Sequence, residues 1–573
     1  MEVVSTTGAS LRPPVEWHSI HWKKAHRNVR RLQTRIVKAL REGKKRKVKA
    51  LQFILTRSFS GRAVAVRRVT ENQGKNTPGV DNVVWNNPAK KSQAISELRH
   101  SGYHPQPLKR VFIPKSDGRL RPLSIPAMKD RAMQALHLLA LDPIAETTAD
   151  PNSYGFRKER STADAIEQSF AVLSRKNSAQ YILDADIKAC FDNISHEWIL
   201  ANAPMDKITL AKWLKAGYLY QQVWNETEAG TPQGGIISPA IMNLTLDGLE
   251  RKLLKSFPQG RRSRQSYKVN FVRYCDDFII TGSTKELLED KVKPLVEEFL
   301  KERGLELSPE KTRISHISDG FDFLGKNIRK YKGKLIIKPS TKNVKSILSK
   351  IGETIKGNLH TPVEQLIGKL NPIIKGWANH HRHTVSKDSF RRVDSETFLK
   401  LWSWAKRRHP NKNPTWIKEK YFKSIGTRNW VFQTTLPIER GKLHTIRLAN
   451  AMDVAIKRHI KIKNGANPYD PEWEIYFEGR LGLNMLENLK ERKRLLHLWF
   501  DQDGICPLCS QKITKESGWH IHHLIRRVDG GKDTMDNLVL LHPNCHDQVH
   551  SQRLKVSKPR PVKRGDRRGL SSL

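Results

Sequence analysis

Two adjacent carboxylates, Asp276 and Asp277, lie between two apolar runs that favour β structure, residues 271–274 and 278–280. The pattern predicts a tight hairpin with both acids at its tip. Acids placed in this way can bind divalent cations and bridge them to the phosphates of a nucleotide. The Tyr-x-Asp-Asp motif is short, and an acidic surface turn is the simpler interpretation of an isolated copy.

Three further segments supply groups for the same chemistry. Residues 181–187 read as an apolar strand that ends in acids and is followed by the aromatic Phe191. One such carboxylate beside the two at the hairpin tip would complete an oxygen cage of the kind that Mg²⁺ prefers. The Gly- and Pro-rich segment 230–239 predicts a turn where backbone approaches a ligand closely. Residues 113–123 predict a basic hairpin suited to a triphosphate.

In this order the segments resemble the reverse transcriptases encoded by group II introns of the bacterial type. Three further blocks, Tyr154-Gly155-Phe156-Arg157, residues 307–312 and residues 321–325, also resemble blocks of that family. The resemblance extends over roughly the whole chain, and several blocks in the family's order are far more specific than any one of them.

The resemblance implies which acids are catalytic. Asp186, Asp276 and Asp277 correspond to the three aspartates that hold two Mg²⁺ ions. Asp184 and Asp192 are nearby competitors, but their spacing to the aromatic that follows differs from that of the family.

The resemblance also implies a nucleotide-binding set. Lys115 and Arg121 correspond to the pair that contacts the triphosphate, and Arg119 is the nearest competitor for that role. Phe191 corresponds to the aromatic under the sugar, which admits or excludes a 2′-hydroxyl. Gln233 corresponds to the residue beside the incoming nucleotide.

The charge balance indicates a polyanionic partner. The 573 residues include 103 Lys and Arg against 57 Asp and Glu, a net charge of +46. The basic residues are spread along the chain, which indicates several contact surfaces on a large nucleic acid. No uninterrupted apolar stretch approaches about 18 residues, and no signal segment opens the chain. We therefore expect a soluble, intracellular protein without a membrane partner. The resemblance implies the bacterial cytoplasm and association with the nucleoid.

The five cysteines do not make a disulfide framework. Cys275 stands where the family more often has alanine, and we expect an exposed thiol near the metal site. Near the C-terminus, Cys506 and Cys509 pair with His542 and Cys545. Two close ligand pairs with this separation predict a structural zinc site, and free cysteines in a small core are the alternative.

The histidines between and after these zinc ligands resemble those of an HNH endonuclease, whose ββα fold presents one metal ion to a phosphodiester. The resemblance implies that His523 is the general base and that Asn537 orients it. His522, His546 and His550 would hold the catalytic Mg²⁺ or Mn²⁺, and His520 would be structural only. The alternative is a zinc-binding DNA module without cleavage.

Helical periodicity predicts further core positions. In the basic segment 16–60 these are Trp22, Val29, Leu32, Ile36, Leu40, Leu51 and Ile54. After Pro339, apolar residues recur at three-, four- and seven-residue intervals, namely Val344, Ile347, Leu348, Ile351, Ile355, Val363, Leu366, Ile367 and Leu370. Pro372 is expected to break or kink the second of these two helices.

The chain is too long for one compact core, so three or more domains are expected. The resemblance implies an α+β multidomain fold. With the resemblance, this is a right-hand polymerase with fingers, palm and helical thumb, followed by a small ββα domain with zinc. The expected segments are a basic N-terminal extension with the first fingers segment (1–105), fingers and palm (106–335), a thumb or maturase domain X (336–425), a DNA-binding region (426–500), an HNH domain (501–555) and a basic tail (556–573).

These expectations combine into one multifunctional protein. It would bind its group II intron RNA in a ribonucleoprotein, aid splicing, nick target DNA and copy the RNA from the new 3′ end with deoxynucleoside triphosphates (dNTPs). A splicing cofactor without polymerase activity, and a reverse transcriptase of the retron or diversity-generating type, are the alternatives. The intact acids argue against the first and the C-terminal HNH pattern against the second.

Overall fold

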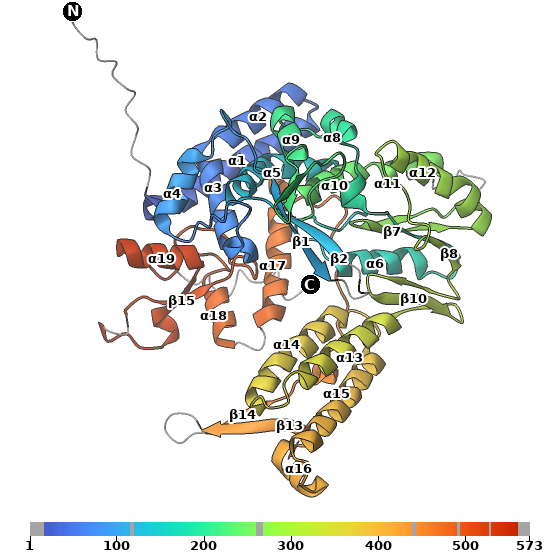
Figure 1. The fold of residues 1–573 in the computed structure, drawn as a ribbon, viewed down its shortest axis with the longest axis vertical. Helices are drawn as coiled ribbons and strands as arrows, with labels where there is room; N and C mark the ends of the chain where they lie inside the picture. The colour runs from blue at the N-terminus through green and yellow to red at the C-terminus, as the bar shows by residue number, and fades with distance from the viewer. Residues whose placement is uncertain are drawn as a thin grey trace, which may run out of the picture.

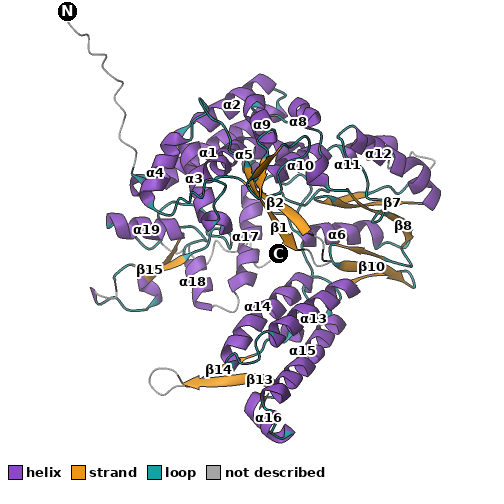
Figure 2. Cartoon of the chain, in the orientation of Figure 1, coloured by secondary structure: helices purple, strands orange, loops and turns teal. Residues whose placement is uncertain are grey.

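The computed structural model describes residues 16–114, 118, 120–258, 267–437, 443–489, 493–526 and 529–559. Helices dominate the chain, and the strands form small separate sheets between them (Figure 2). This is the α+β multidomain arrangement that the sequence predicts. No helix in these ranges is both long and apolar enough to span a bilayer.

The N-terminal part is a helical layer. Its elements are η1 (Trp17–Ser19), α1 (Trp22–Arg41), α2 (Lys45–Arg57), α3 (Phe59–Glu71), η2 (Gln73–Asn76), α4 (Pro88–Glu97) and the central helix α5 (Met128–Thr148). The predicted core stripe is buried, except that Leu40 is half-buried and Ile54 is 49% exposed. The prediction for Ile54 is wrong because the buried face of α2 is formed by Val48, Leu51 and Leu55, and Ile54 lies outside that face.

A four-stranded sheet in the order β2-β1-β4-β5 combines two strands from residues 108–125 with two from residues 218–225. Its strands are β1 (Leu108–Pro114), β2 (Leu120–Ile125), β4 (Tyr218–Tyr220) and β5 (Val223–Asn225). Strands β1 and β2 pair antiparallel, with Ile113 opposite Arg121, and form the expected basic hairpin. Short helices α7 (Cys190–Asn193), α8 (His196–Asn202) and α9 (Lys207–Leu214) connect this region to the central sheet.

The central sheet has the order β6-β7-β3-β8 and carries the acids. Its antiparallel strands are β3 (Tyr181–Asp186), β6 (Phe271–Tyr274), β7 (Asp277–Gly282) and β8 (Arg313–His316). One face packs on α10 (Ser238–Leu246), α11 (Leu249–Ser256), η3 (Leu287–Val292) and α12 (Lys293–Lys301). The other face packs on α6 (Thr162–Leu173) and on the sheet of β9 (Phe321–Phe323), β10 (Lys326–Tyr331) and β11 (Lys334–Pro339). Burial on both faces fixes the register of β3, so its acids emerge at a defined end.

A helical bundle follows and projects away from the sheets (Figure 1). Its helices are α13 (Thr341–Lys356), α14 (Val363–His381), α15 (Lys387–Arg408) and α16 (Pro414–Tyr421). The predicted stripe is buried except at Val363, which is half-buried. Pro372 does not break α14, because Ile374, Trp377 and Ala378 keep the second half packed in the same core.

The segment expected to bind DNA divides between two places. Strands β12 (Phe422–Ile425), β13 (Arg428–Pro437) and β14 (Leu443–Arg447) pack on the bundle. Strands β12 and β13 form a hairpin, and the expected boundary between the thumb and the DNA-binding region, at residue 425, falls within it. Beyond η5 (Ala451–Asp453) the chain returns to α6, where Asp164 accepts hydrogen bonds from the amide of Ile462 and from His459. Then come η6 (Pro471–Trp473), α17 (Glu474–Leu489) and α18 (Lys493–Asp501).

The C-terminal unit contains β15 (His520–His523), η8 (Met535–Asn537), β16 (Leu538–Leu541) and α19 (Pro543–Gln552). Strands β15 and β16 pair antiparallel, which gives the ββα arrangement expected of this segment. In Figure 1 the unit lies beside the N-terminal helices, and Trp17 of η1 donates a hydrogen bond to Asn544 of α19. The two ends of the described chain therefore meet.

Candidate functional site

The three predicted acids converge at one end of the central sheet. Asp186 ends β3 and lies directly opposite Asp277, the first residue of β7. Directly opposed residues in an antiparallel pair have Cα atoms about 4.5–5.5 Å apart. Tyr274 pairs with Asp277, so Cys275 and Asp276 form the two-residue turn between β6 and β7. Cys275 has a left-handed φ of 61°, a conformation that hairpin turns of this length require.

A cavity of about 940 Å³ opens at these acids. Residues from six separate segments line it, among them Asp186, Asp276, Arg121, Phe191 and Gln233. Lys115, the other residue predicted for the triphosphate, lies outside the described residues. Asp277, unlike the other two acids, is not among the residues that line the cavity. The structure thus brings one predicted basic, one aromatic and one amide side chain to the same space as the acids.

The carboxylates crowd one another. Loss of water, a hydrogen bond with Asp186 and the charges of neighbouring acids raise the pKa of Asp277 to about 8. Burial also raises the pKa of Asp276. It raises the pKa of Asp184, which lies on the same face of β3 as Asp186, to about 7. Lys311 lies among these carboxylates, with its Nζ 2.5 Å from Asp186 Oδ2. Such a cluster of acids favours bound cations.

The turn that carries Asp276 is held from behind. The guanidinium of Arg273 is fully buried and donates to Asp247, to Asn243 and to the carbonyl of Cys275. Gly155 packs against the same turn, where an added Cβ would lie 2.3 Å from the backbone nitrogen of Cys275. The prediction of an exposed thiol is wrong, because this packing leaves Cys275 8% exposed and burial raises the pKa of its thiol to about 12.

The glycine-rich loop lies on the aromatic side of the cavity. The amide of Thr231 donates to the carbonyl of Phe191, and the amide of Ser124 donates to the carbonyl of Gln233. Gly230 has a φ of 83°, and a Cβ there would lie 2.5 Å from the carbonyl oxygens of Phe191 and Asp192. Gly230 is therefore required where the loop packs against neighbouring backbone. The sequence predicts instead that the loop glycines allow backbone to approach a ligand closely.

The predicted nuclease histidines form a second cluster. The imidazoles of His522, His546 and His550 place their nitrogens within 4.8 Å of one another. Burial and the two neighbouring imidazoles lower the pKa of His522 to about 4, so it is neutral, as a metal ligand must be. Its buried Nδ1 has no hydrogen-bond partner in the part of the chain that the structure describes. His520 and Asp547 also lie near His546, and these three residues form an alternative set of ligands.

His523, the predicted general base, contacts a carboxylate. His523 Nε2 lies 2.6 Å from Asp533 Oδ1. The amide group of Asn537 instead bonds the backbone of Ile525 in both directions and the carbonyl of Lys532. Asn537 therefore holds the loop that carries Asp533, and Asp533 contacts the histidine.

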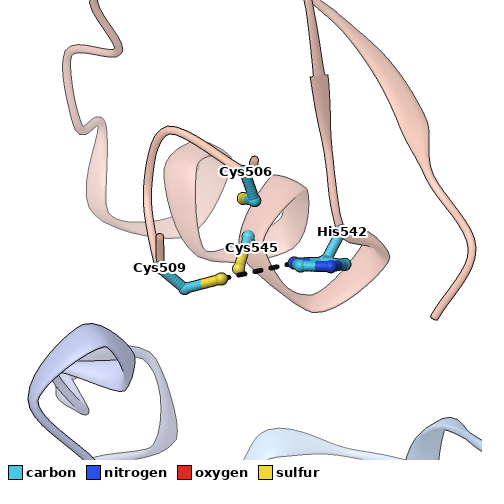
Figure 3. A group of neighbouring side chains, drawn as sticks. All are labelled: Cys506, Cys509, His542 and Cys545. Carbon is cyan, nitrogen blue, oxygen red and sulfur yellow. Dashed lines mark hydrogen bonds between the residues drawn. The ribbon is translucent and has the colours of Figure 1, made fainter. Parts of the chain in front are cut away.

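The zinc pattern also converges (Figure 3). Cys506, Cys509 and Cys545 are fully buried and His542 is 3% exposed, with all four ligand atoms within 4.8 Å of one another. His542 Nδ1 lies 3.3 Å from Cys509 Sγ. Three soft thiolates and one imidazole around a closed centre fit a structural Zn²⁺ ion.

Comparisons with known proteins agree with this geometry. Family models match for the N-terminal domain of reverse transcriptase (residues 17–98), reverse transcriptase or RNA-dependent DNA polymerase (113–328), the maturase-specific domain of group II introns (344–422) and HNH endonuclease (506–552). The four matches follow one another along the chain in that order. This chain belongs to the reverse transcriptases encoded by group II introns.

Two curated relatives illustrate the assignment. Protein YkfC of Escherichia coli is 32% identical over 46% of this chain and 78% of its own length. The group II intron-encoded protein LtrA of Lactococcus lactis is 30% identical over 46% of this chain, which spans about half (54%) of LtrA. A solved telomerase from Candida albicans with a telomeric RNA fragment covers 56% of this chain and 65% of its own, at 11% identity and a TM-score of 0.29, too low to carry an argument.

The group II intron assignment fixes the coarse function. The chain combines a right-hand reverse transcriptase, a maturase domain and an HNH endonuclease domain, as the sequence analysis predicts. The maturase and reverse transcriptase domains imply binding of intron RNA. Two residues at these sites were missed. The sequence could have pointed to Lys311, since it belongs to the block at residues 307–312. Asp533 lies in a loop without a motif.

Proposed function

We propose that Asp186, Asp276 and Asp277 form the metal-binding centre at which this protein copies intron RNA into DNA. One observation carries the proposal: Asp186 and Asp277 are directly opposed strand neighbours, and Asp276 stands in the adjoining turn on the wall of the cavity. The crowding that raises the pKa of Asp276 and Asp277 means that divalent cations would relieve a repulsion already present. Two Mg²⁺ ions fit this donor set.

Each cavity residue then has a separate task. When bound, the two metal ions supply activation of the primer 3′-hydroxyl and neutralisation of the leaving pyrophosphate. Arg121 contacts the triphosphate, and Lys115 keeps the same role from the sequence alone. Phe191 packs under the sugar, with the ring of Phe156 6.1 Å from its own, and Gln233 orients the nucleotide. Lys311 balances charge at Asp186.

Primer extension on a homopolymer template tests the centre. We expect Asp276→Asn and Asp277→Asn to abolish extension and to leave RNA binding intact, because each change removes a charged ligand without changing its size. Asp319→Asn, an exposed aspartate at the edge of the neighbouring strands, is the matched control. Normal extension by either variant would refute the assignment. A wild-type protein that binds RNA without extending primers would support the splicing-cofactor alternative.

For the HNH domain we propose that His522, His546 and His550 hold one Mg²⁺ or Mn²⁺ and that His523 is the general base that activates water. Asp533 orients His523 through its 2.6 Å contact, and Asn537 holds the loop in place. His523→Ala should remove strand nicking and leave primer extension unchanged. Persistent nicking would mean that another residue is the base. The same assay on His520→Ala and His550→Ala decides which of them is a ligand.

The order of events follows from the two chemistries. Cleavage of the second DNA strand leaves a 3′-hydroxyl, which is the primer that the polymerase centre needs. We therefore propose target-primed reverse transcription, with intron RNA as template, target DNA as primer and dNTPs as substrates. The four residues Cys506, Cys509, His542 and Cys545 hold a structural Zn²⁺ in the nuclease unit. Metal analysis of the purified protein, with Cys509→Ser as the variant that loses the ion, tests the zinc assignment.

A further inference from the structure

Helix α19 contacts both the nuclease histidine cluster and the N-terminal helices. Its residues His546 and His550 face the nuclease histidine cluster, whereas Asn544, Cys545 and Gln548 are buried. Asn544 accepts a hydrogen bond of 2.7 Å from Trp17, and Gln548 donates to the carbonyls of His18 and Ile20. The buried face of α19 therefore docks on the N-terminal domain of the reverse transcriptase.

Arg67 of α3 crosses this interface to the zinc ligands. Its side chain is almost fully buried, and its Nη2 lies 3.7 Å from the Sγ of Cys545. The remaining contacts fix the guanidinium: Nε donates to Glu71 at 3.0 Å and Nη1 lies 3.5 Å from His26. The group also lies 4.9 Å from the ring of Trp22. In Figure 3 pale blue ribbon of the N-terminal part is visible below the four ligands.

The net charge of the zinc-bound site explains why an arginine would lie against it. Three thiolates and a neutral imidazole around Zn²⁺ carry a net charge of −1, inside a site that is closed to water. A buried charge is costly unless another charge or hydrogen bond compensates it. An arginine is always protonated, and its N–H groups can donate to a thiolate sulfur. Arg67 is the arginine that the structure places against a ligand sulfur of the nuclease unit.

We propose that Arg67 of the N-terminal domain completes the zinc centre by donating to the Cys545 thiolate and balancing its charge, so that zinc binding and docking of the nuclease unit stabilise each other. The proposal rests on the zinc assignment made above. Arg67 acts through Cys545 and is a positioning residue. Because linkage is reciprocal, docking strengthens zinc binding by the same factor by which zinc strengthens docking, and loss of the Arg67 contact should weaken both. The metal would thereby set the position of α19 and of the nuclease histidines on it.

The first experiment measures zinc affinity by chelator competition on the full chain. We expect Arg67→Gln to weaken it about 10- to 100-fold, the usual effect of removing a hydrogen-bond partner of a metal ligand. Arg67→Lys keeps the charge and should recover part of the loss. Arg68→Gln, on the adjacent exposed position of α3, is the matched control and should bind zinc normally. Primer extension by each variant checks that the polymerase is folded.

A spectroscopic readout separates direct contact from general damage. A hydrogen bond lowers the energy of the sulfur lone pair, so its removal should shift the thiolate-to-metal charge-transfer band of the Co²⁺-substituted protein to lower energy in Arg67→Gln and not in Arg68→Gln. An unchanged band, or an unchanged zinc affinity, would overturn the proposal while leaving the zinc assignment intact. Wild-type protein without any bound zinc would instead refute the zinc assignment itself.

The reciprocal experiment needs no substitution. Removing zinc from the wild-type protein should increase amide hydrogen exchange in residues 17–20 and 59–71, on the N-terminal side of the interface. The central sheet at residues 181–186 is the internal control and should keep its protection. Equal protection of residues 17–20 and 59–71 with and without zinc would show that the metal and the docking are independent.

Discussion

Gly155 offers a sharp test of how the catalytic turn is held. A Cβ at this position would lie 2.3 Å from the backbone nitrogen of Cys275 and 2.4 Å from its Sγ. Ordinary contacts begin at 3.4 Å, so Gly155→Ala requires a displacement of about 1 Å. The segment around Gly155 is fixed, since the amide of Tyr154 donates to the carbonyl of Arg273 and Asn243 donates to the carbonyl of Gly155. The turn with Asp276 must therefore yield.

A displacement of about 1 Å at a reacting centre costs roughly 100-fold in rate. We expect kcat for primer extension by Gly155→Ala to fall by about this factor, with little change in RNA affinity. Overpacking of this kind also lowers the free energy of unfolding by about 1–3 kcal/mol. Steady-state extension with varied dNTP, together with thermal unfolding, measures both quantities.

Two further variants make the test specific. Gly368→Ala, in α14 where nothing lies within 4 Å of the added Cβ, should extend primers at the wild-type rate. Adding Cys275→Ala to Gly155→Ala should not restore activity, because the clash with the backbone nitrogen remains. If Gly155→Ala copies RNA within twofold of the wild-type rate at an unchanged melting temperature, the turn is not held as described.

Three other predictions address different parts of the molecule. Arg273→Met leaves Asp247 buried without its ion pair and should lower the free energy of unfolding in denaturant titrations by about 3–5 kcal/mol. Asp533→Asn removes the charge that orients His523, so nicking should slow while primer extension is unchanged; equal nicking rates would rule out the pairing. Burial lowers the pKa of His137 from 6.5 to about 3, so only the unfolded chain is protonated between these values and stability falls as the pH falls through this window. His137→Gln should reduce that slope by up to about 1.4 kcal/mol per pH unit, and an unchanged slope would contradict the cause.

Local patterns in the sequence were sufficient for the elements that carry the chemistry. The two apolar runs on either side of Asp276 and Asp277 predict the β6–β7 hairpin, and the helical spacing from Val344 predicts α13. The paired zinc ligands were found because both pairs are close in sequence. Each of these predictions depends on residues within a few positions of one another.

The predictions that failed, and the residues that were missed, depend on contacts between distant segments. The burial of Cys275 follows from Gly155, which lies 120 positions earlier. Sequence marks a glycine as special but does not say what approaches it. The pairing of His523 with Asp533 depends on a loop whose shape Asn537 sets through backbone contacts. The contact between Arg67 and Cys545 has no sequence signal at all.

The electrostatics of the polymerase centre explain why one lysine lies among its acids. Asp184, Asp186, Asp276 and Asp277 gather at the end of β3 and the adjoining turn, in a chain whose net charge is +46. Without metal, Lys311 is a cation 2.5 Å from Asp186, and its own pKa is raised by that contact and by the other acids. Since about half of the Lys311 side chain is exposed, binding of the proposed metal ions by Asp186 would displace it towards solvent. The lysine thus stabilises the folded, metal-free centre without occupying the cavity permanently.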